Sequence, residues 1–105
     1  MKNQIKWLGH SAFEIRTSKR KRILIDPWLS GNPLNGLNVE EFLSPDLILV
    51  THDHHDHYGS DIPTLLKASE GLLFGQPELI ARALAEGVSA KNIVNEGAGM
   101  NIGGT

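Results

Sequence analysis

The stretch that decides the fold is Thr51-His52-Asp53-His54-His55-Asp56-His57-Tyr58-Gly59, which directly follows the apolar residues 47–50. It holds four of the five histidines in the 105-residue chain, interleaved with two aspartates. Imidazole and carboxylate groups bind divalent metals readily, and the chain has no cysteine to compete with them. The stretch therefore predicts a metal site with the pattern His-x-His-x-Asp-His, whose fixed residues are His52, His54, Asp56 and His57.

The spacing within the pattern divides these residues into two pairs. His52 and His54 are two positions apart, so in an extended backbone both imidazoles project to the same side and converge on one ion at about 2.0–2.1 Å. Asp56 and His57 are adjacent and follow a bend, which points them more naturally at a second ion. The other positions, expected to face away and to be solvated or to lie behind the ligands, are Asp53 and His55. The alternative, a polar loop with incidental histidines that bind nickel fortuitously, fits this density and spacing poorly.

The apolar periodicity around the stretch predicts an α/β fold. In chain order, the elements expected before it are strands at 5–8, 12–17 and 23–25, a helical turn at 39–43 and a strand at 46–51. The first three strands read as an antiparallel meander. The last has the near-continuous apolar pattern of a strand buried on both faces, and the metal motif begins where it ends. Ligand sites in open α/β sheets gather at the carboxyl ends of strands, so this placement favours function.

After the stretch, helices and strands alternate. A helix capped by Ser60 or Asp61 is expected to end near residue 68. A buried strand over 71–75 and a helix over 76–86 follow, and 92–95 is a final candidate strand. The apolar face of the second helix consists of Leu79, Ile80, Ala83 and Leu84. This alternation predicts parallel strands covered by helices, within a single domain 1–105.

Two residues outside the stretch are candidates for the same site. Asp26 ends the strand 23–25 and comes close to the histidines if that strand neighbours the strand 46–51. Its carboxylate would then accept the spare N–H of a ligand histidine and fix its tautomer. The alternative is an ordinary turn aspartate before proline. His10 either lines the mouth of the site or is a surface histidine, and Tyr58 is expected to pack rather than to orient substrate.

Composition excludes several classes of protein. A chain of 105 residues with a formal net charge of −2 is large enough for one domain and has no overall attraction to nucleic acid or anionic membrane. The basic run 19–22 is best explained as a solvated hairpin tip. Without cysteine, disulfides, thiolate zinc sites and cysteine nucleophiles are excluded. The sequence has neither a signal peptide nor a run of about 20 apolar residues, so a soluble, cytoplasmic protein is expected.

These residues together resemble the metallo-β-lactamase superfamily. The stretch 51–59 matches its signature His-x-His-x-Asp-His-x-Gly at every fixed position, and Ile25-Asp26-Pro27 resembles the strand-end aspartate that precedes the signature in the family. Gly9-His10-Ser11 and residues 26–33 look most like the branch described only as metal-dependent hydrolases, which is related to the sugar-lactone hydrolases.

The resemblance implies an αββα sandwich of two similar halves, of which this chain is expected to be the N-terminal half. It implies that His52 and His54 bind a first metal and that Asp56 and His57 bind a second. It also implies three further ligands from the other half: a histidine for the first metal, a bridging aspartate and a last histidine for the second. In this chain no histidine follows His57, and the only later aspartate, Asp61, is too close to serve as the bridge. The expected cofactor is Zn²⁺, as one or two ions, with Mn²⁺, Fe²⁺ and Ni²⁺ as alternatives.

The leading interpretation is a metal-dependent hydrolase acting on a small-molecule substrate. In the family, a water held between the metals attacks an ester, lactone, amide or phosphoester, and the resemblance gives Asp56 a catalytic part in orienting that water or accepting its proton. With two ligands per ion, this chain is expected to bind metal weakly and to have little activity alone. The alternatives are a non-catalytic metal-binding half-domain that self-associates through an exposed sheet edge, and a nuclease-type member of the same superfamily.

Overall fold

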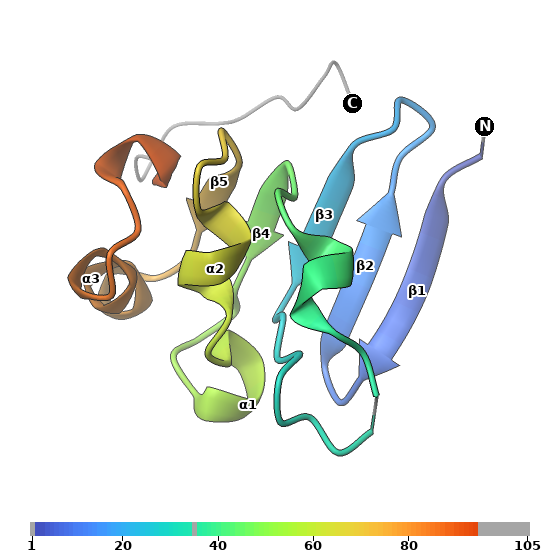
Figure 1. The fold of residues 1–105 in the computed structure, drawn as a ribbon, viewed down its shortest axis with the longest axis horizontal. Helices are drawn as coiled ribbons and strands as arrows, with labels where there is room; N and C mark the ends of the chain where they lie inside the picture. The colour runs from blue at the N-terminus through green and yellow to red at the C-terminus, as the bar shows by residue number, and fades with distance from the viewer. Residues whose placement is uncertain (1, 35, 95–105) are drawn as a thin grey trace.

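The computed structural model describes residues 2–34 and 36–94, which form a five-stranded mixed sheet with flanking helices (Figure 1). In sequence and in space alike, the strand order is β1 (Gln4–Gly9), β2 (Ala12–Arg16), β3 (Arg22–Ile25), β4 (Leu47–Leu49) and β5 (Leu72–Phe74). The predicted α/β class is confirmed. No helix among the described residues has the length and apolar character needed to cross a membrane.

The first three strands form the antiparallel meander that their alternating pattern predicts. Trp7 pairs with Phe13, and Phe13 pairs with Ile25 on the next strand. The turn between β1 and β2 is irregular, because the register shifts between Trp7 and Gly9. Gly9 (φ 101°) and His10 (φ 55°) both adopt left-handed backbone there. Such a bulge re-aims the side chains next to it, and here the re-aimed side chain is His10.

The last two strands extend the sheet in the parallel sense, which requires crossover connections. The crossover from β3 to β4 carries the 3₁₀ helix η1 (Val39–Phe42), as the predicted helical turn anticipated. The crossover from β4 to β5 carries two short helices, α1 (His55–Tyr58) and α2 (Ile62–Leu66). The helix α3 (Pro77–Ala85) and the 3₁₀ helix η2 (Ala90–Asn92) follow β5.

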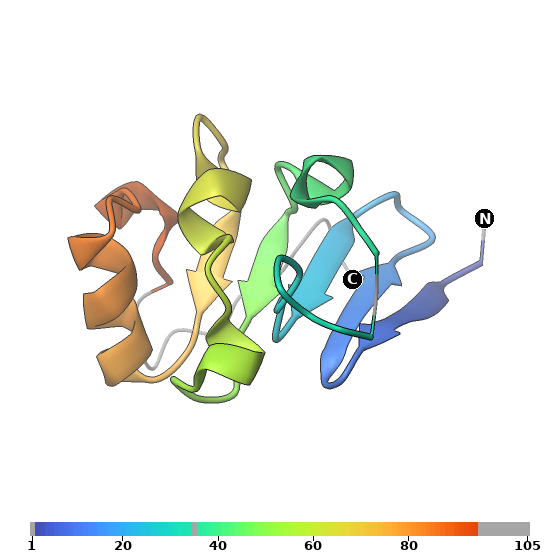
Figure 2. The same ribbon diagram turned by 60° about the horizontal axis from the view of Figure 1, so that its bottom comes forward.

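The hydrophobic core lies between the sheet and the helices that cover one of its faces (Figure 2). Leu24, Ile48 and Leu73 stand side by side on β3, β4 and β5, and all three side chains are fully buried. Leu65 of α2 and Phe42 of η1 belong to the same buried cluster. Burying each such side chain contributes about 1.5–3 kcal/mol, so this layer fixes the sheet on which the metal motif sits.

The opposite face of the sheet is also apolar. Because side chains alternate along a strand, one paired row across the sheet consists of Trp7, Phe13, Ile25, Leu49 and Phe74. The ends of this row are open to solvent, since Trp7 is 58% exposed and Phe74 is 43% exposed. The sheet is therefore apolar on both sides, as in the middle layers of a sandwich.

The strand predicted at 92–95 is wrong over its described part. Residues 90–92 form η2, and Ile93 makes a single parallel bridge to β5. Local hydrogen bonds explain the difference: the Ser89 hydroxyl accepts a backbone N–H two residues on (3.4 Å), and the Asn92 amide donates to the carbonyls of residues 69 and 71 (2.8 and 2.7 Å). Residue 95 lies outside the described residues.

Two helix predictions are also corrected. The helix expected to end near residue 68 ends at Leu66, and the Asp61 carboxylate does not cap it. Asp61 is buried and instead accepts hydrogen bonds from the backbone N–H and the hydroxyl of Ser30 (2.8 Å each). On α3, Leu79 and Ala83 are buried as predicted, whereas Leu84 is 43% exposed. Leu84 follows Ala83 by one residue, so its side chain is rotated by about 100° around the helix axis and points away from the core.

Candidate metal centre

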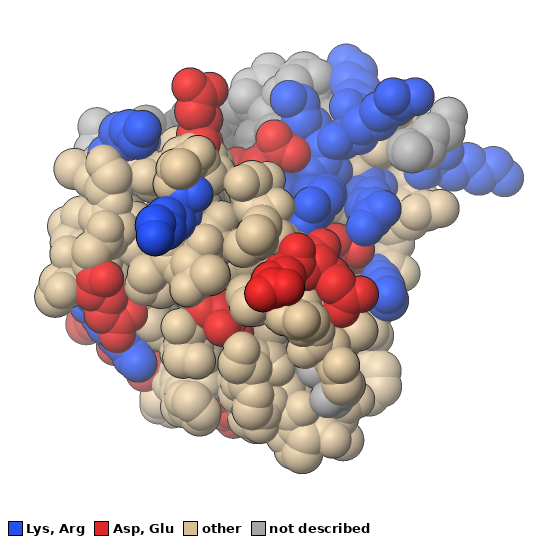
Figure 3. All heavy atoms as spheres, viewed as in Figure 1, with Lys and Arg blue, Asp and Glu red and all other residues tan. Residues whose placement is uncertain are grey.

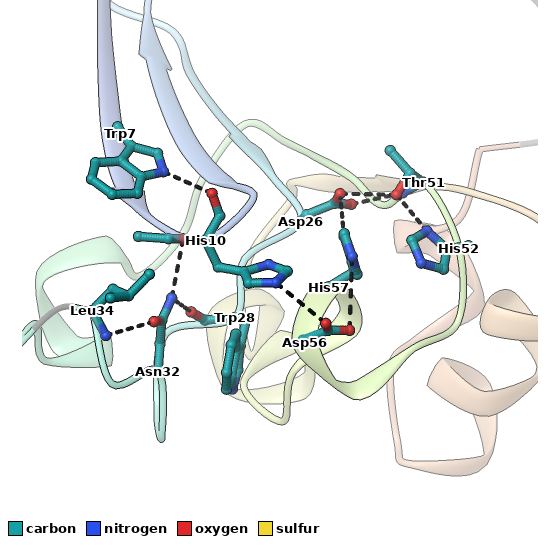
Figure 4. Close-up of polar contacts among 11 residues, drawn as sticks. Trp7, His10, Asp26, Trp28, Asn32, Leu34, Thr51, His52, Asp56 and His57 are labelled. Carbon is teal, nitrogen blue, oxygen red and sulfur yellow. Dashed lines mark hydrogen bonds and ion pairs between the residues drawn. The ribbon is translucent and has the colours of Figure 1, made fainter.

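The histidine-rich stretch leaves the sheet at the carboxyl ends of β3 and β4 (Figure 4). These two strands are neighbours, and the backbone N–H of Asp26 donates to the carbonyl of Leu49 (2.8 Å). The end of β3 is thereby held against the first residues of the motif. Beyond His54 the chain forms the single helical turn α1, which the sequence did not predict. That turn carries Asp56 and His57.

Asp26 is the buried anchor of the site. The residue is 3% exposed, and its carboxylate accepts three hydrogen bonds. They come from the backbone N–H of Thr51 to Oδ1 (2.7 Å), from the Thr51 hydroxyl to Oδ2 (2.9 Å) and from Nδ1 of His57 to Oδ2 (2.9 Å). Because an ionised carboxylate only accepts, the last contact assigns the proton of His57 to Nδ1. The unprotonated Nε2 is then left for a metal ion.

The Thr51 hydroxyl fixes the tautomer of His52 in the same way. Thr51 Oγ1 lies 2.8 Å from His52 Nδ1. A hydroxyl has one proton, and Thr51 gives it to Asp26, so it accepts from His52 Nδ1–H. His52 is thereby also left with an unprotonated Nε2. The sequence analysis assigned no role to Thr51. The only signal in the sequence was a hydroxyl side chain directly before the first histidine of the motif.

Three histidines of the motif lie together. The ring of His52 is 4.5 Å from that of His54 and 4.1 Å from that of His57, measured between centroids. The backbone between the first two is bent rather than extended, because the N–H of His54 donates to the carbonyl of His52 (3.1 Å). The rings meet despite this bend. Their role as metal ligands stays a prediction.

A second group forms around Asp56. Its Oδ1 lies 3.7 Å from His57 Nε2, and its Oδ2 lies 3.4 Å from His10 Nε2. One ligand atom from each of His10, Asp56 and His57 lies within 4.8 Å of the others. The β1–β2 turn thus brings His10 to the motif, although the sequence left its position open.

The residues present fit a divalent metal ion. Imidazole nitrogens and a carboxylate oxygen are a donor set that suits Zn²⁺ and that Mn²⁺, Fe²⁺ and Ni²⁺ also accept. The hydrogen bonds of Asp26 and Thr51 hold His57 and His52 in the tautomer that offers Nε2.

A polar network behind the motif was missed by sequence reasoning. Asp53 accepts a hydrogen bond from Arg82 of α3 (2.8 Å), and the Arg82 guanidinium also lies over the Tyr58 ring, 4.2 Å from its centroid. Glu86 accepts from Arg82 Nε (3.2 Å) and from the Tyr58 hydroxyl (2.8 Å). The hydrogen bond to Asp53 raises the pKa of Arg82. In the sequence, Arg82 and Glu86 lie one helical turn apart, which indicates a contact between the two. That spacing does not show that Arg82 also contacts Asp53 or that Glu86 also contacts Tyr58.

Tyr58 is buried, and its phenol gives a pH-dependent prediction. Burial first, and then the hydrogen bond to and the charge of Glu86, raise the pKa of Tyr58 above the ordinary value of 10.0. The folded state therefore prefers the protonated phenol. Its contribution to stability is complete below about pH 10 and is lost as the pH rises further, because the unfolded chain ionises first.

Tyr58→Phe removes this contribution. At pH 7 we expect it to lower the free energy of unfolding by about 1 kcal/mol, the value of a buried hydrogen bond. Above about pH 10 the difference from the wild type should shrink. Urea unfolding at pH 7, 9, 10 and 11 measures it. A difference that is the same at every pH would contradict the assigned protonation of Tyr58.

An apolar cavity opens beside the motif. Its volume is about 490 Å³, and residues 49–51 and 74–77 line it. These are the carboxyl ends of β4 and β5, together with the first turn of α3. Thr51 is therefore shared between the cavity wall and the hydrogen bonds that orient His52 and His57.

Comparison with known proteins places the chain in a family of metal-binding proteins. Residues 4–104 match the family model of the beta-lactamase superfamily domain, so the chain belongs to that family. Its curated relatives include a UPF0173 metal-dependent hydrolase of Caldivirga maquilingensis, 44% identical over 100 residues, with 95% of this chain and 40% of the relative covered. A UPF0173 metal-dependent hydrolase of Nitratidesulfovibrio vulgaris is 40% identical over 107 residues, with 100% and 43% covered.

A solved structure shares the arrangement of the sheet. It is a metallo hydrolase from the archaeon Ignicoccus hospitalis, with a TM-score of 0.71 and 28% identity over 93% of this chain and 41% of that chain. The predicted resemblance to metal-dependent hydrolases of the metallo-β-lactamase superfamily is confirmed. The chain spans about two fifths of the length of these relatives.

Proposed function

We propose that this chain supplies the metal-binding part of a metal-dependent hydrolase. The observation that carries the proposal is the buried carboxylate of Asp26, which orients His57 directly and His52 through Thr51. A buried carboxylate that sets two imidazoles with Nε2 unprotonated is costly to maintain unless those nitrogens bind something. In this proposal His52 and His54 hold one ion, preferably Zn²⁺, and Asp56 and His57 hold a second.

The chemistry follows from that placement. Held by these residues, a divalent ion would supply polarisation of a carbonyl or phosphoryl oxygen and a water whose pKa is lowered to near neutrality. The side chain of Asp56 is 43% exposed, so a carboxylate oxygen can face the reacting group and orient water or accept its proton. Asp26 and Thr51 keep the imidazoles from rotating as charge develops. The reaction class is hydrolysis of an ester, lactone or phosphoester.

The substrate proposed is a small molecule. The apolar cavity of about 490 Å³ has the volume of a small-ligand site and adjoins Thr51.

A nuclease function has less support. Seven of the ten Lys and Arg residues lie within residues 2–22, and in Figure 3 basic side chains gather over the end of β1–β3 away from the motif. We therefore include no nucleic-acid partner. The cysteine-free composition supports a cytoplasmic location.

Metal content tests the proposed function. Protein purified without a tag and dialysed against Zn²⁺ should retain the ion by elemental analysis, and the double variant His52→Ala/His54→Ala should retain less. The matched control is His55→Ala, because His55 is an exposed histidine of the same stretch, at the start of α1, and lies outside the proposed ligand set. Equal Zn²⁺ in the wild type and the double variant would contradict the proposal.

A second candidate function rests on the apolar face of the sheet that carries exposed Ile5 and Trp7. Trp7 and Ile5 of β1 are 58% and 72% exposed, and β1 is an edge strand. Exposed apolar faces and free edges favour association. The chain would then be a metal-binding half-domain that pairs with a second copy. Light scattering coupled to size exclusion should give the mass of a dimer in that case, and Trp7→Lys should return it to a monomer. A monomeric wild type at high protein concentration would contradict pairing.

A further inference from the structure

The β1–β2 turn holds His10 in a conformation that needs support. His10 has φ 55°, a left-handed conformation that residues other than glycine rarely adopt. Two contacts support it: the Trp7 indole N–H donates to the carbonyl of His10 (2.7 Å), and the buried Asn32 amide donates to the carbonyl of Gly9 (3.1 Å). A strained conformation persists only where its surroundings determine it, and such positions gather at functional sites.

The same turn fixes where the imidazole of His10 lies (Figure 4). Its ring stands edge-on to that of Trp28 (5.6 Å between centroids) and to that of His57 (5.3 Å), each at an interplanar angle of 80°. Held between these two rings, Nε2 of His10 faces the carboxylate of Asp56. The arrangement directs one particular nitrogen of His10 at the motif.

The distances around Asp56 fit a shared ion better than hydrogen bonds. His10 Nε2 lies 3.4 Å from Asp56 Oδ2, and His57 Nε2 lies 3.7 Å from Asp56 Oδ1. Both are longer than the usual N–H···O distance of about 2.7–3.2 Å. Two ligands bound at about 2.0–2.1 Å to one tetrahedral ion lie about 3.3–3.4 Å apart. The distance from His10 matches that edge length, and the distance from His57, measured to the other carboxylate oxygen, is longer; one ligand atom from each of the three residues still lies within 4.8 Å of the others.

We propose that His10 is a third protein ligand of the ion that Asp56 and His57 bind. The inference rests on the proposed metal-binding function and deepens it, because it gives this ion three ligands from the described residues instead of two. Since His57 Nδ1 is held by Asp26, its Nε2 is the nitrogen available to the same ion. The donor set is two imidazoles and one carboxylate, which is a common set for Zn²⁺ with a fourth position open.

Cobalt titration tests the ligand set. Metal-free full-length chain is titrated with Co²⁺, whose visible absorption reports tetrahedral coordination. His10→Asn is the informative variant, because asparagine tolerates positive φ and the turn should be kept. We expect it to weaken Co²⁺ binding by about tenfold or more and to lower the tetrahedral absorption. The matched control is His55→Asn, since His55 also stands edge-on to Trp28, at 5.7 Å; it should bind Co²⁺ like the wild type.

The outcomes separate this inference from the proposed function. If Asp56→Ala and His57→Ala lose Co²⁺ while His10→Asn binds like the wild type, His10 is not a ligand and the metal site stands. If none of these variants changes Co²⁺ binding, or the wild type binds none, both proposals fail. A second measurement needs no variant: ¹⁵N spectra of the labelled wild type with Zn²⁺ should show His10 Nε2 without a proton. A proton retained on that nitrogen would overturn the inference.

Discussion

Asp26→Asn is expected to lower the affinity for Zn²⁺ by about 10- to 100-fold, the usual effect of losing a group that orients a metal ligand. Asparagine suits the position sterically, because Asp26 has φ 46° and asparagine tolerates this conformation. The amide oxygen can still accept from the backbone N–H of Thr51. The amide nitrogen then replaces Oδ2, which accepts from both the Thr51 hydroxyl and His57.

The loss of affinity follows from proton positions. An amide N–H facing His57 Nδ1 forces that nitrogen to accept, so the proton of His57 moves to Nε2. The Thr51 hydroxyl accepts from the amide and turns its own proton toward His52 Nδ1, which moves the proton of His52 to Nε2 as well. One substitution thus protonates the nitrogens proposed to bind metal on two histidines that it does not replace.

Zinc titration calorimetry measures the affinity, and ¹⁵N spectra of the metal-free variant report both tautomers. The matched control is Asp61→Asn, which alters another buried carboxylate with two hydrogen bonds, both from Ser30. Both variants should lose about 1–3 kcal/mol of stability, and only Asp26→Asn should lose Zn²⁺ affinity. Equal Zn²⁺ affinities in the two variants would show that Asp26 acts through stability alone.

The dependence of the site on Asp26 shows what the sequence could and could not predict. The alternation of Ala12-Phe13-Glu14-Ile15 and the apolar run before Thr51 predicted strands correctly, because burial on one or both faces leaves a periodic pattern. That Asp26 and Thr51 touch depends on β3 and β4 being neighbours, and strand order has no local signature. From the sequence alone Asp26 was therefore only a candidate, and the sheet order brings it into contact with Thr51 and His57.

Short elements were the least predictable. The turn α1 is four residues long and lies within the metal motif, so it has no room for an apolar period. Ile93 and Val94 have the β-branched side chains typical of strands, yet the amide of Asn92 donates to two backbone carbonyls just before β5. Arg82 reaches Asp53 across 29 residues of sequence. In each case a tertiary contact decides the outcome, and neither composition nor periodicity records it.

Gly59, the last residue of the motif, is expected to tolerate no side chain. It ends α1 with φ 68° and ψ −148°, a combination that is essentially restricted to glycine. An added Cβ would also lie 3.1 Å from both the carbonyl oxygen of Pro27 and the Cα of Trp28, which are backbone atoms. Gly59→Ala should therefore push residues 27–28 away from the motif and displace Asp26, one residue earlier.

The expected result is a loss of about 1–3 kcal/mol from backbone strain, with an added cost from the contact. Two glycines separate these effects. Gly87 also has a positive φ (105°) but has no atom within 4 Å of its added Cβ, so Gly87→Ala reports strain alone. Gly36 likewise has no atom within 4 Å of its added Cβ, so Gly36→Ala should be close to neutral.

Urea unfolding ranks the stabilities of the three variants, and zinc titration shows which substitution also lowers Zn²⁺ affinity. We expect stability to fall in the order Gly36→Ala, Gly87→Ala, Gly59→Ala, and Zn²⁺ affinity to fall only in the last. If Gly87→Ala and Gly59→Ala are equally destabilised and both bind Zn²⁺ like the wild type, the close approach of residues 27–28 does not position Asp26. The glycine of the motif would then serve only the turn that ends α1.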